Sequence, residues 1–497
     1  MASKNRNSIR LIAGVVAGII LAMAISSFNG GSSSPLLEVW HTEKLNEEFT
    51  AELLNDEISN FNEYIELEDK LFKQLDKKVY AETDTGPDHV LNRYSAGSAV
   101  DPRGLQPNWN RSFELEGSGI GGVLLLHGMS DSPYSLRALA EALNGQGYHV
   151  IGLRLPGHGT APSGLKYVRW QDMVAAVTLA MEHLYSELGS ASSALHIIGY
   201  STGASLALDF TLKALDGKHS TVPDSLILIS PAIRVHGAAR LAGFKDGLSV
   251  LPGLGNLAWL TVMDEFDPYK YNSFATNAGS QVHRVTVDVD RRVQALASNP
   301  GAAEGFPPVL VLKSTVDSTV TTDAVVDNLL KRLPADRNEL VLFDINRQAA
   351  IKSTLLVSDP GPLTNRLLAD HSLPFAVTFV TNENPYSNAV EARYKAPHSA
   401  DPLTSDLLGF EWPRGVVSLS HVALPIPPDD PLYGQFPPGK QEHIFLGNLA
   451  VKGERGLLKI PESWLLRMRY NPFYSYLEGR VMDWVKEPAG LKGFGTE

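Results

Sequence analysis

The chain has 497 residues, no cysteine and a formal net charge of −12 at pH 7. The lack of cysteine excludes disulfides, thiolate metal sites and a cysteine nucleophile. The acidic balance argues against nucleic acid as a partner. Because the length exceeds one ordinary domain, we expect a large core with insertions or appendages.

Residues 1–35 have the pattern of a membrane-targeting segment. Three cations precede an apolar run, Leu11–Ile25, which continues weakly to Phe28 and is followed by a polar spacer. The run is longer than a signal-peptide core and shorter than a typical span. Two interpretations stay open: an uncleaved anchor that leaves the body outside the cytoplasmic membrane, or a signal cleaved after Ala24, which would release a secreted protein.

Residues 36–86 form an acidic extension with helical spacing. Ile58, Ile65, Phe72 and Val79 recur every seven residues, and Glu68 interrupts the apolar stripe. The pattern favours a helix packed on the main domain over a coiled-coil stalk. Residues 87–120, of which 87–107 are rich in Gly, Ser and Pro, are predicted to link this extension to a domain over 121–485.

Strand-like and helix-like segments alternate through that domain. Buried strands are expected at 121–126, 149–153, 195–199, 226–230, 309–314 and 340–343, and helices at 135–145, 170–188 and 322–333. This alternation predicts an α/β fold with a mostly parallel sheet and helices on both faces. Ligands bind such sheets at the carboxyl ends of the strands.

Ser201 follows one of these strands, in the sequence Gly199-Tyr200-Ser201-Thr202-Gly203. An apolar strand, a serine between two glycines and a small-residue helix indicate a tight turn with the serine at its apex. A side chain at position 199 or 203 would collide with the neighbouring strand or helix. The first amides of the helix would favour negative charge beside the serine.

Two further motifs accompany this turn, His127-Gly128-Met129-Ser130-Asp131-Ser132-Pro133 and Leu155-Pro156-Gly157-His158-Gly159-Thr160-Ala161-Pro162. Together the three motifs resemble the monoacylglycerol lipase and serine-peptidase S33 branch of the α/β-hydrolase superfamily, over about residues 121–434. The resemblance implies the α/β-hydrolase fold with an inserted lid. It does not indicate a particular substrate.

The resemblance also implies roles for individual residues. Ser201 would be the nucleophile, and the backbone N–H groups of Met129 and Thr202 would form the oxyanion hole. Asp317, three residues past the strand at 309–314, would be the acid of the triad, whereas Asp323 suits the first turn of the next helix. His158 is expected to be structural.

The histidine of the triad departs from the family pattern. Compact members carry it shortly after the strand that is here 340–343, but residues 344–349 contain none. We therefore expect an insertion over 344–415, with the histidine beyond or within it. The strand-like run 416–420 ends at a loop base with His421, which is the favoured candidate; His371 is the second, and His398 and His443 lie in polar loops.

The predicted lid, residues 231–307, has an apolar first half, which favours a lipid-like ester unless it only packs the lid on the body. The leading hypothesis is a serine hydrolase of carboxylic esters, with monoacylglycerol or lysophospholipid as first substrates and an acyl-enzyme intermediate. A peptidase or amidase of the same fold and a non-catalytic binding protein are the alternatives. No metal or organic cofactor is implied, and the membrane is the expected partner.

Overall fold

The computed structural model describes residues 36–189, 193–234, 255–317, 319–349, 356, 359–437, 445–447, 451–452, 465–466 and 468–488. The predicted membrane segment, His443 and the apolar residues 235–254 of the predicted lid lie outside these ranges. Among the helices within them, none combines the length and the apolar character that a membrane crossing requires.

One ten-stranded sheet organises the molecule, in the order β1-β3-β2-β4-β5-β8-β9-β10-β11-β12. All neighbours from β3 to β10 pair in parallel, and the strands at the two ends pair antiparallel. The strands are β1 Phe113–Leu115, β2 Gly121–Leu126, β3 His149–Leu153, β4 Ala194–Tyr200, β5 Ser225–Ile229, β8 Val309–Ser314, β9 Glu339–Phe343, β10 Ala376–Asn382, β11 Ala389–Lys395 and β12 Thr404–Glu411. Short ladders join β6 Trp259–Thr261 to β7 Phe274–Ala275, and β13 Val451–Lys452 to β14 Leu465–Leu466.

Helices cover both faces of this sheet, because its parallel strands are apolar on both sides. Ile197 belongs to the core cluster under α6, α7 and α9, and Ile198 to the opposite cluster under α4 and α13. The predicted mostly parallel α/β-hydrolase fold is therefore confirmed. The helices are α2 Val39–Thr42, α3 Phe61–Lys78, α4 Arg137–Gly145, α5 Gly164–Tyr167, α6 Trp170–Glu187, α7 Thr202–Leu215, α9 Thr276–Ala297, α10 Pro300–Ala303, α11 Thr322–Asn328, α12 Gly361–Ala369 and α13 Tyr474–Lys486.

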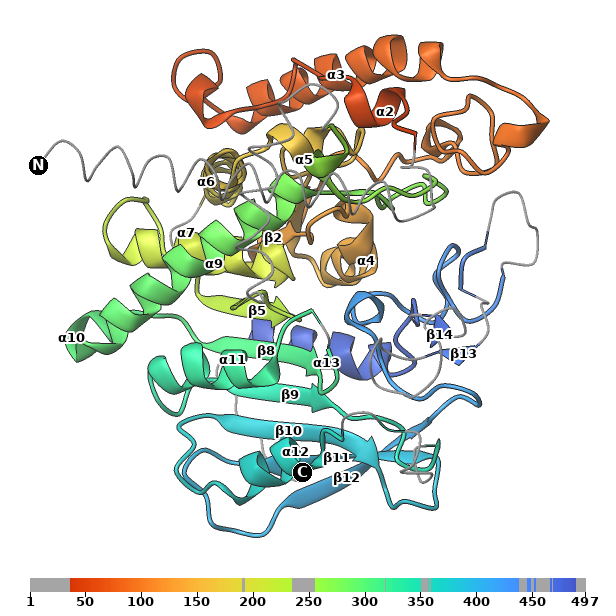
Figure 1. The fold of residues 1–497 in the computed structure, drawn as a ribbon. Coiled ribbons are helices and arrows are strands. Elements are labelled where there is room, and N and C mark those ends of the chain that lie inside the picture. The colour runs from red at the N-terminus through yellow and green to blue at the C-terminus, as the bar shows by residue number, and fades with distance from the viewer. Residues whose placement is uncertain are drawn as a thin grey trace, which may run out of the picture.

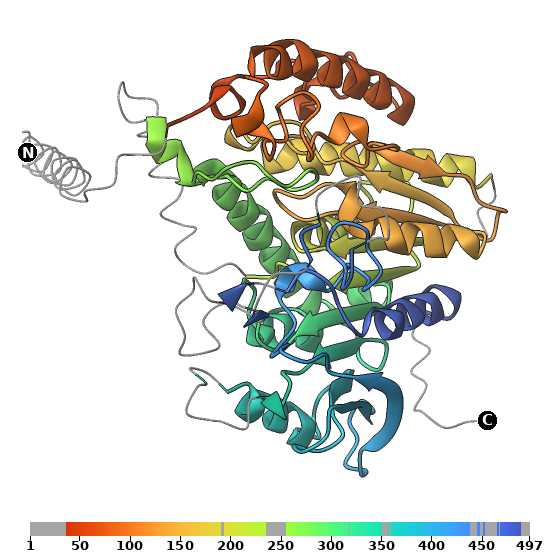
Figure 2. The same cartoon turned by 90° about the vertical axis from the view of Figure 1, so that its right-hand side faces the viewer.

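The acidic extension lies on the body, at the end of the molecule opposite β12 (Figures 1 and 2). Phe61 and Tyr64 of α3 are buried in the main core cluster, and the Tyr64 hydroxyl donates to the Arg154 carbonyl at 2.6 Å. Glu68, which interrupts the apolar stripe, is buried and pairs with Arg154 Nε at 2.8 Å. The packed helix is thus the correct interpretation, and the coiled-coil stalk is not.

The predicted linker, residues 87–120, is also folded onto the body and does not act as a spacer. Arg93 and Tyr94 are almost fully buried. The Arg93 N–H donates to the Glu265 carbonyl at 2.8 Å, and the Tyr94 hydroxyl donates to the Thr160 carbonyl at 3.0 Å. Composition alone did not predict this packing. Glycine and proline determine the backbone shape of a segment, but they do not prevent other residues, here Arg93 and Tyr94, from being buried.

The segment predicted as a lid contains a core element. Parallel strands β5 and β8 are neighbours, so a crossover must connect them, and α9 does so with Val285, Val289 and Val293 buried against the main core. Residues 276–297 are therefore a structural helix. The described part that precedes them carries the β6–β7 hairpin, whose neighbour Tyr271 donates its N–H to the Ser130 carbonyl at 2.8 Å.

The insertion over 344–415 enlarges the sheet. Helix α12 leads to β10, which pairs in parallel with β9, and β11 and β12 follow antiparallel. In both views the blue segment that follows β12 runs back toward the middle of the molecule (Figures 1 and 2). Residues 416–420 lie in this returning segment and form no strand, in contrast to the strand-like pattern of their sequence.

Candidate active site

Ser201 occupies the turn between β4 and α7. Its backbone has φ 54° and ψ −113°, a left-handed conformation that costs energy in any residue with a Cβ atom. A Cβ atom on Gly199 would lie 2.5 Å from Ala204 Cα, and one on Gly203 would lie 2.1 Å from the Leu126 carbonyl oxygen. Glycine is needed at both positions for the reason that the motif predicts: strand, turn and helix are in direct contact.

The structure brings Ser201, His421 and Asp317 together. Ser201 Oγ lies 3.1 Å from His421 Nε2, and His421 Nδ1 lies 2.8 Å from Asp317 Oδ2. The side chains of His421 and Asp317 are buried, and Ser201 is partly exposed. A hydroxyl, an imidazole and a carboxylate in this order can move a proton off the serine as it attacks an electrophile.

The other candidate residues lie elsewhere. His371 and His398 are exposed, with His371 Nδ1 2.9 Å from the Ser399 carbonyl oxygen and His398 Nε2 3.6 Å from Asp336. Asp323 lies in the first turn of α11, as expected, and pairs with Arg366. Among the candidates that the structure describes, only His421 contacts both Ser201 and Asp317.

His421 reaches the serine because the returning segment is attached to the carboxyl ends of β8 and β9. Asn346, just after β9, donates its backbone N–H to Val417 O at 2.7 Å and its side-chain N–H to Val416 O at 3.0 Å. Ser314, the last residue of β8, donates its hydroxyl to Leu419 O at 3.0 Å. The returning segment thus passes the end of β9, where the sequence resemblance implies the histidine.

Asp317 is held by four donors. Its Oδ1 accepts the N–H groups of Thr319 at 2.8 Å and Val320 at 3.0 Å, and its Oδ2 accepts from His421 and from Lys313 Nζ at 2.9 Å. Burial would raise the pKa of Asp317, but the charges of His421 and Lys313 outweigh it and hold that pKa well below its usual range. The carboxylate is therefore ionised at any pH at which the protein would work.

Lys313 is the site residue that sequence reasoning missed. It is the fifth residue of β8, and its side chain is completely buried. The available signal was a lysine inside the otherwise apolar strand Val309–Leu312, four residues before the predicted acid. Buried lysines almost always have a charged partner, so this pattern could have indicated a link to Asp317.

The turn that carries Met129 lies beside Ser201. A Cβ atom on Gly128 would lie 3.2 Å from Ser201 Cβ. Thr202 is the first residue of α7, so its N–H has no acceptor within the helix and is available to a ligand. Thr202 thus follows the serine in the chain, and the turn that carries Met129 lies beside the serine in space.

Two buried histidines stabilise this turn. Leu155 N–H donates to His127 Nε2 at 3.1 Å, and His127 Nδ1 lies 2.8 Å from Gly128 O. Burial lowers the pKa of His127 well below its ordinary value, which leaves it neutral with the proton on Nδ1. His158 Nδ1 lies 2.9 Å from Pro156 O, and burial lowers its pKa to about 4. His158 has the backbone contact expected of a structural residue.

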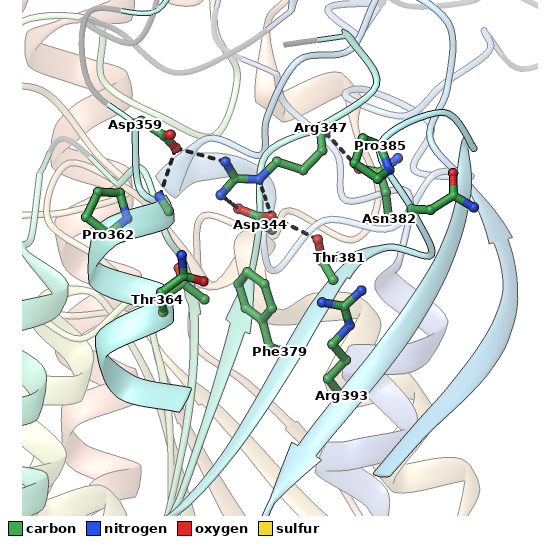
Figure 3. Close-up of a pocket in the computed structure, with 13 residues that line it drawn as sticks. Asp344, Arg347, Asp359, Pro362, Thr364, Phe379, Thr381, Asn382, Pro385 and Arg393 are labelled. Atoms are coloured by element: carbon green, nitrogen blue, oxygen red, sulfur yellow. Dashed lines mark hydrogen bonds and ion pairs between the residues drawn. The ribbon is translucent and has the colours of Figure 1, made fainter. Parts of the chain in front are cut away.

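The described ranges contain no cluster of His, Cys, Asp or Glu side chains that could hold a metal ion. A polar cavity of about 410 Å³ lies on the insertion, between α12 and β10, and contains none of the residues discussed above. Figure 3 shows Arg347 of this cavity between Asp344 and Asp359, which it contacts at 2.7 Å and 2.8 Å. The charges of the cavity are thus largely paired with one another.

Comparisons with known proteins agree with this fold. Residues 120–345 match the family described as serine aminopeptidase, S33. A thermostable monoacylglycerol lipase from Bacillus sp. (strain H-257) is 39% identical over 87 residues, which are 18% of this chain and 33% of that protein. The chain therefore spans about a third of the length of this curated relative.

Solved structures with some similarity include a metagenome-derived lipolytic enzyme, 21% identical with a TM-score of 0.38, which covers 47% of this chain and 87% of its own. The monoacylglycerol lipase of Paleococcus ferrophilus is 20% identical with a TM-score of 0.35, over 47% of this chain and 88% of its own. The family match is the stronger result. Over residues 120–345, the resemblance of this chain to the serine aminopeptidase S33 branch of the α/β-hydrolase superfamily is confirmed.

Proposed function

We propose that this protein is a serine hydrolase of carboxylic esters. The observation that carries the proposal is the continuous contact from Ser201 Oγ through His421 to Asp317. His421 would take the Ser201 proton as the oxygen attacks the ester carbonyl, and would pass it to the leaving alcohol. Water would then hydrolyse the acyl-enzyme by the same proton transfers, and Asp317 would hold the imidazole and stabilise its cation.

The backbone N–H groups of Met129 and Thr202 would bind the oxyanion of each tetrahedral intermediate. Removing one such donor costs about 3 kcal/mol in the barrier of comparable hydrolases. The turn of Met129 is supported by neutral His127, whose two ring nitrogens both contact backbone groups. These donors would therefore be in place before the substrate arrives.

An ester is favoured over a peptide by the acidic residues near this turn. An aminopeptidase needs a free carboxylate for the amino terminus of its substrate. Asp131 Oδ2 lies 3.6 Å from Lys270 Nζ. Asp267 accepts a hydrogen bond from the Tyr433 hydroxyl, and its Oδ2 lies 3.1 Å from the Arg469 guanidinium. Both carboxylates are occupied within the protein. The relative described as a monoacylglycerol lipase and the apolar sequence over 241–260 support a lipid-like acyl group.

We also propose that residues 1–35 keep the protein at the cytoplasmic membrane, with the body on the outer side. The first described residues lie along the β6–β7 hairpin, since His41 Nε2 is 2.9 Å from Ser273 Oγ and its ring is 5.0 Å from that of Trp259. Leu36, Leu260 and Met263 are exposed there. Cell fractionation and the N-terminal sequence of the mature protein test this: a start at Ile25 would replace the anchor by a cleaved signal.

The ester proposal is tested with protein lacking residues 1–35, on p-nitrophenyl esters of increasing acyl length and on monoacylglycerols. We expect ester turnover that increases from acetyl to medium-chain acyl groups. Aminoacyl p-nitroanilides serve as the comparison substrates. Turnover of these amides without turnover of any ester would overturn the proposal in favour of a peptidase.

A further inference from the structure

Lys313 stands out among the buried charged side chains because it belongs to a core strand. The four residues that precede it in β8, Val309–Leu312, are apolar, and the strand lies between β5 and β9 with all six residues buried. Burying an ammonium group is costly unless a partner compensates for its charge. The side chain reaches Asp317 Oδ2 at 2.9 Å and the Val320 carbonyl oxygen at 2.5 Å.

Lys313 and His421 donate to the same oxygen atom. His421 Nδ1 lies 2.8 Å from Asp317 Oδ2, and Lys313 Nζ lies 2.9 Å from it. The Asp317 charge is therefore shared between the Lys313 ammonium and, whenever His421 is protonated, the imidazolium. In a triad without such a lysine, the carboxylate would act on the histidine alone.

We propose that Lys313 is a positioning residue that sets the pH range of the Ser201 site by compensating the Asp317 charge. The inference rests on the proposed function, because it concerns the proton affinity of His421 as the base. With the ammonium present, protonation of the imidazole adds a second positive charge beside one carboxylate. Removing the ammonium would stabilise the protonated imidazole, so that the site would become inactive at a higher pH.

Other elements also bring titratable groups to this place. Tyr200 at the end of β4 has its ring 5.3 Å from that of His421 and donates its hydroxyl to His421 O at 3.4 Å. Ser201 Oγ lies 3.1 Å from His421 Nε2, the ring nitrogen that does not face Asp317. Neither group carries a positive charge, so Lys313 is the group whose removal changes the charge next to Asp317 without removing a triad member.

The experiment measures the rate constant for labelling of Ser201 by a fluorophosphonate between pH 4 and pH 9. In this reaction the serine oxygen attacks phosphorus and fluoride leaves, which requires neutral His421 to take the serine proton. The experiment can therefore be done without knowing the substrate. In Lys313→Met we expect the midpoint of the acid limb to rise by about one pH unit, within the range for loss of a neighbouring charge. Lys313→Arg keeps the charge and should leave the midpoint near that of the wild type.

Lys395→Met is the matched control. Lys395 on β11 is also buried, but its ammonium donates to two backbone carbonyls, those of Leu367 at 3.1 Å and Asp370 at 2.5 Å. A purely structural role of Lys313 predicts that both variants lose stability and that neither moves the midpoint. An unmoved midpoint in Lys313→Met would overturn the inference, whereas wild-type protein that does not label at any pH would overturn the proposed function itself.

A second measurement covers the case in which Lys313→Met does not fold. Asp317→Asn leaves the ammonium buried without its charged partner, and adding Lys313→Met removes that unpaired charge. We therefore expect the double variant to have a higher melting temperature than Asp317→Asn. A double variant that melts no higher than Asp317→Asn would show that the carboxylate does not compensate the ammonium, and this result would overturn the inference.

Discussion

The two sides of the serine site are built in different ways. The side of the proposed nucleophile, with Ser201 and Thr202, is called the nucleophile side. It comes from one strand, one turn and one helix that follow each other in the chain, joined by the adjacent Met129 turn. The acid–base side joins Lys313 and Asp317 to His421, which is 104 residues beyond Asp317 and follows three added strands. Local contacts define the first side, and long-range hydrogen bonds define the second.

The largest expected effect comes from the nucleophile side. Ser201→Ala should lose fluorophosphonate labelling and at least about a thousandfold of esterase activity, because loss of the nucleophile in a comparable triad costs on the order of a millionfold. The substitution removes one oxygen from a partly exposed side chain, so the melting temperature should stay close to that of the wild type. Labelling of the variant at Ser205 or elsewhere would contradict the assignment of Ser201.

His421→Ala tests whether the acid–base side is equally essential. Members of a triad act as a unit, so this variant should match Ser201→Ala in lost turnover. His371→Ala is the control, since His371 is exposed and contacts the Ser399 carbonyl of a neighbouring loop, and it should stay within about tenfold of the wild type. If His371→Ala were the inactive variant, the assigned path of residues 416–421 over β8 and β9 would be wrong.

Acid pH should weaken the His158 contacts beside the Met129 turn and leave the charge of Asp317 unchanged. His158, beside the Met129 turn, has a pKa of about 4 in the folded protein against 6.5 in the unfolded chain. The unfolded state therefore binds more protons between these values, so that stability is complete above pH 6.5 and is lost as the pH falls toward 4. The loss from this residue is on the order of 3 kcal/mol. Asp317 remains ionised throughout this range.

The measurement is the melting temperature as a function of pH for His158→Gln and for His371→Gln. The buried substitution should flatten the dependence between pH 6.5 and pH 4, and the exposed one should leave it unchanged. Equal slopes in the wild type and His158→Gln would mean that burial does not lower the pKa of His158 in the folded protein. Its contact with the Pro156 carbonyl would then need a different explanation.

The difference between local contacts and long-range hydrogen bonds also explains what could be predicted from the sequence. The Ser201 turn, the parallel strands and the packed extension follow from local patterns, namely glycine spacing, apolar runs and helical periodicity. The strands β11 and β12 escaped prediction because neither carries a continuous apolar run: charged residues interrupt β11, and β12 is largely exposed. Arg93 and Lys313 escaped because their burial depends on partners in distant segments, Glu265 and Asp267 for Arg93 and the Asp317 loop for Lys313.

His421 is an intermediate case. Its position at a loop base after residues 416–420 was a correct observation, but the reason was not a strand. The carbonyl groups of this segment accept from Asn346 and Ser314, and these bonds replace the ladder that a strand would have made. The sequence therefore indicated which histidine lies beside Ser201 and Asp317, and not how it is held.

The smallest expected effect tests that attachment directly. Asn346→Ala removes the side-chain donor to Val416 O and leaves the backbone bond to Val417 O in place. The segment before His421 would keep one of its two bonds to the end of β9, so the imidazole should spend more time away from Ser201. We expect kcat to fall about tenfold, equivalent to roughly 1.4 kcal/mol in the barrier, with KM nearly unchanged. Asn384→Ala is the matched control and should have wild-type kcat, because the exposed Asn384 side chain of the same insertion contacts near neighbours in the chain, the Tyr386 N–H and Glu383 Oε2. A normal kcat in Asn346→Ala would show that Ser314 and the backbone alone hold the returning segment, whereas a rise in KM with normal kcat would place Asn346 in substrate binding.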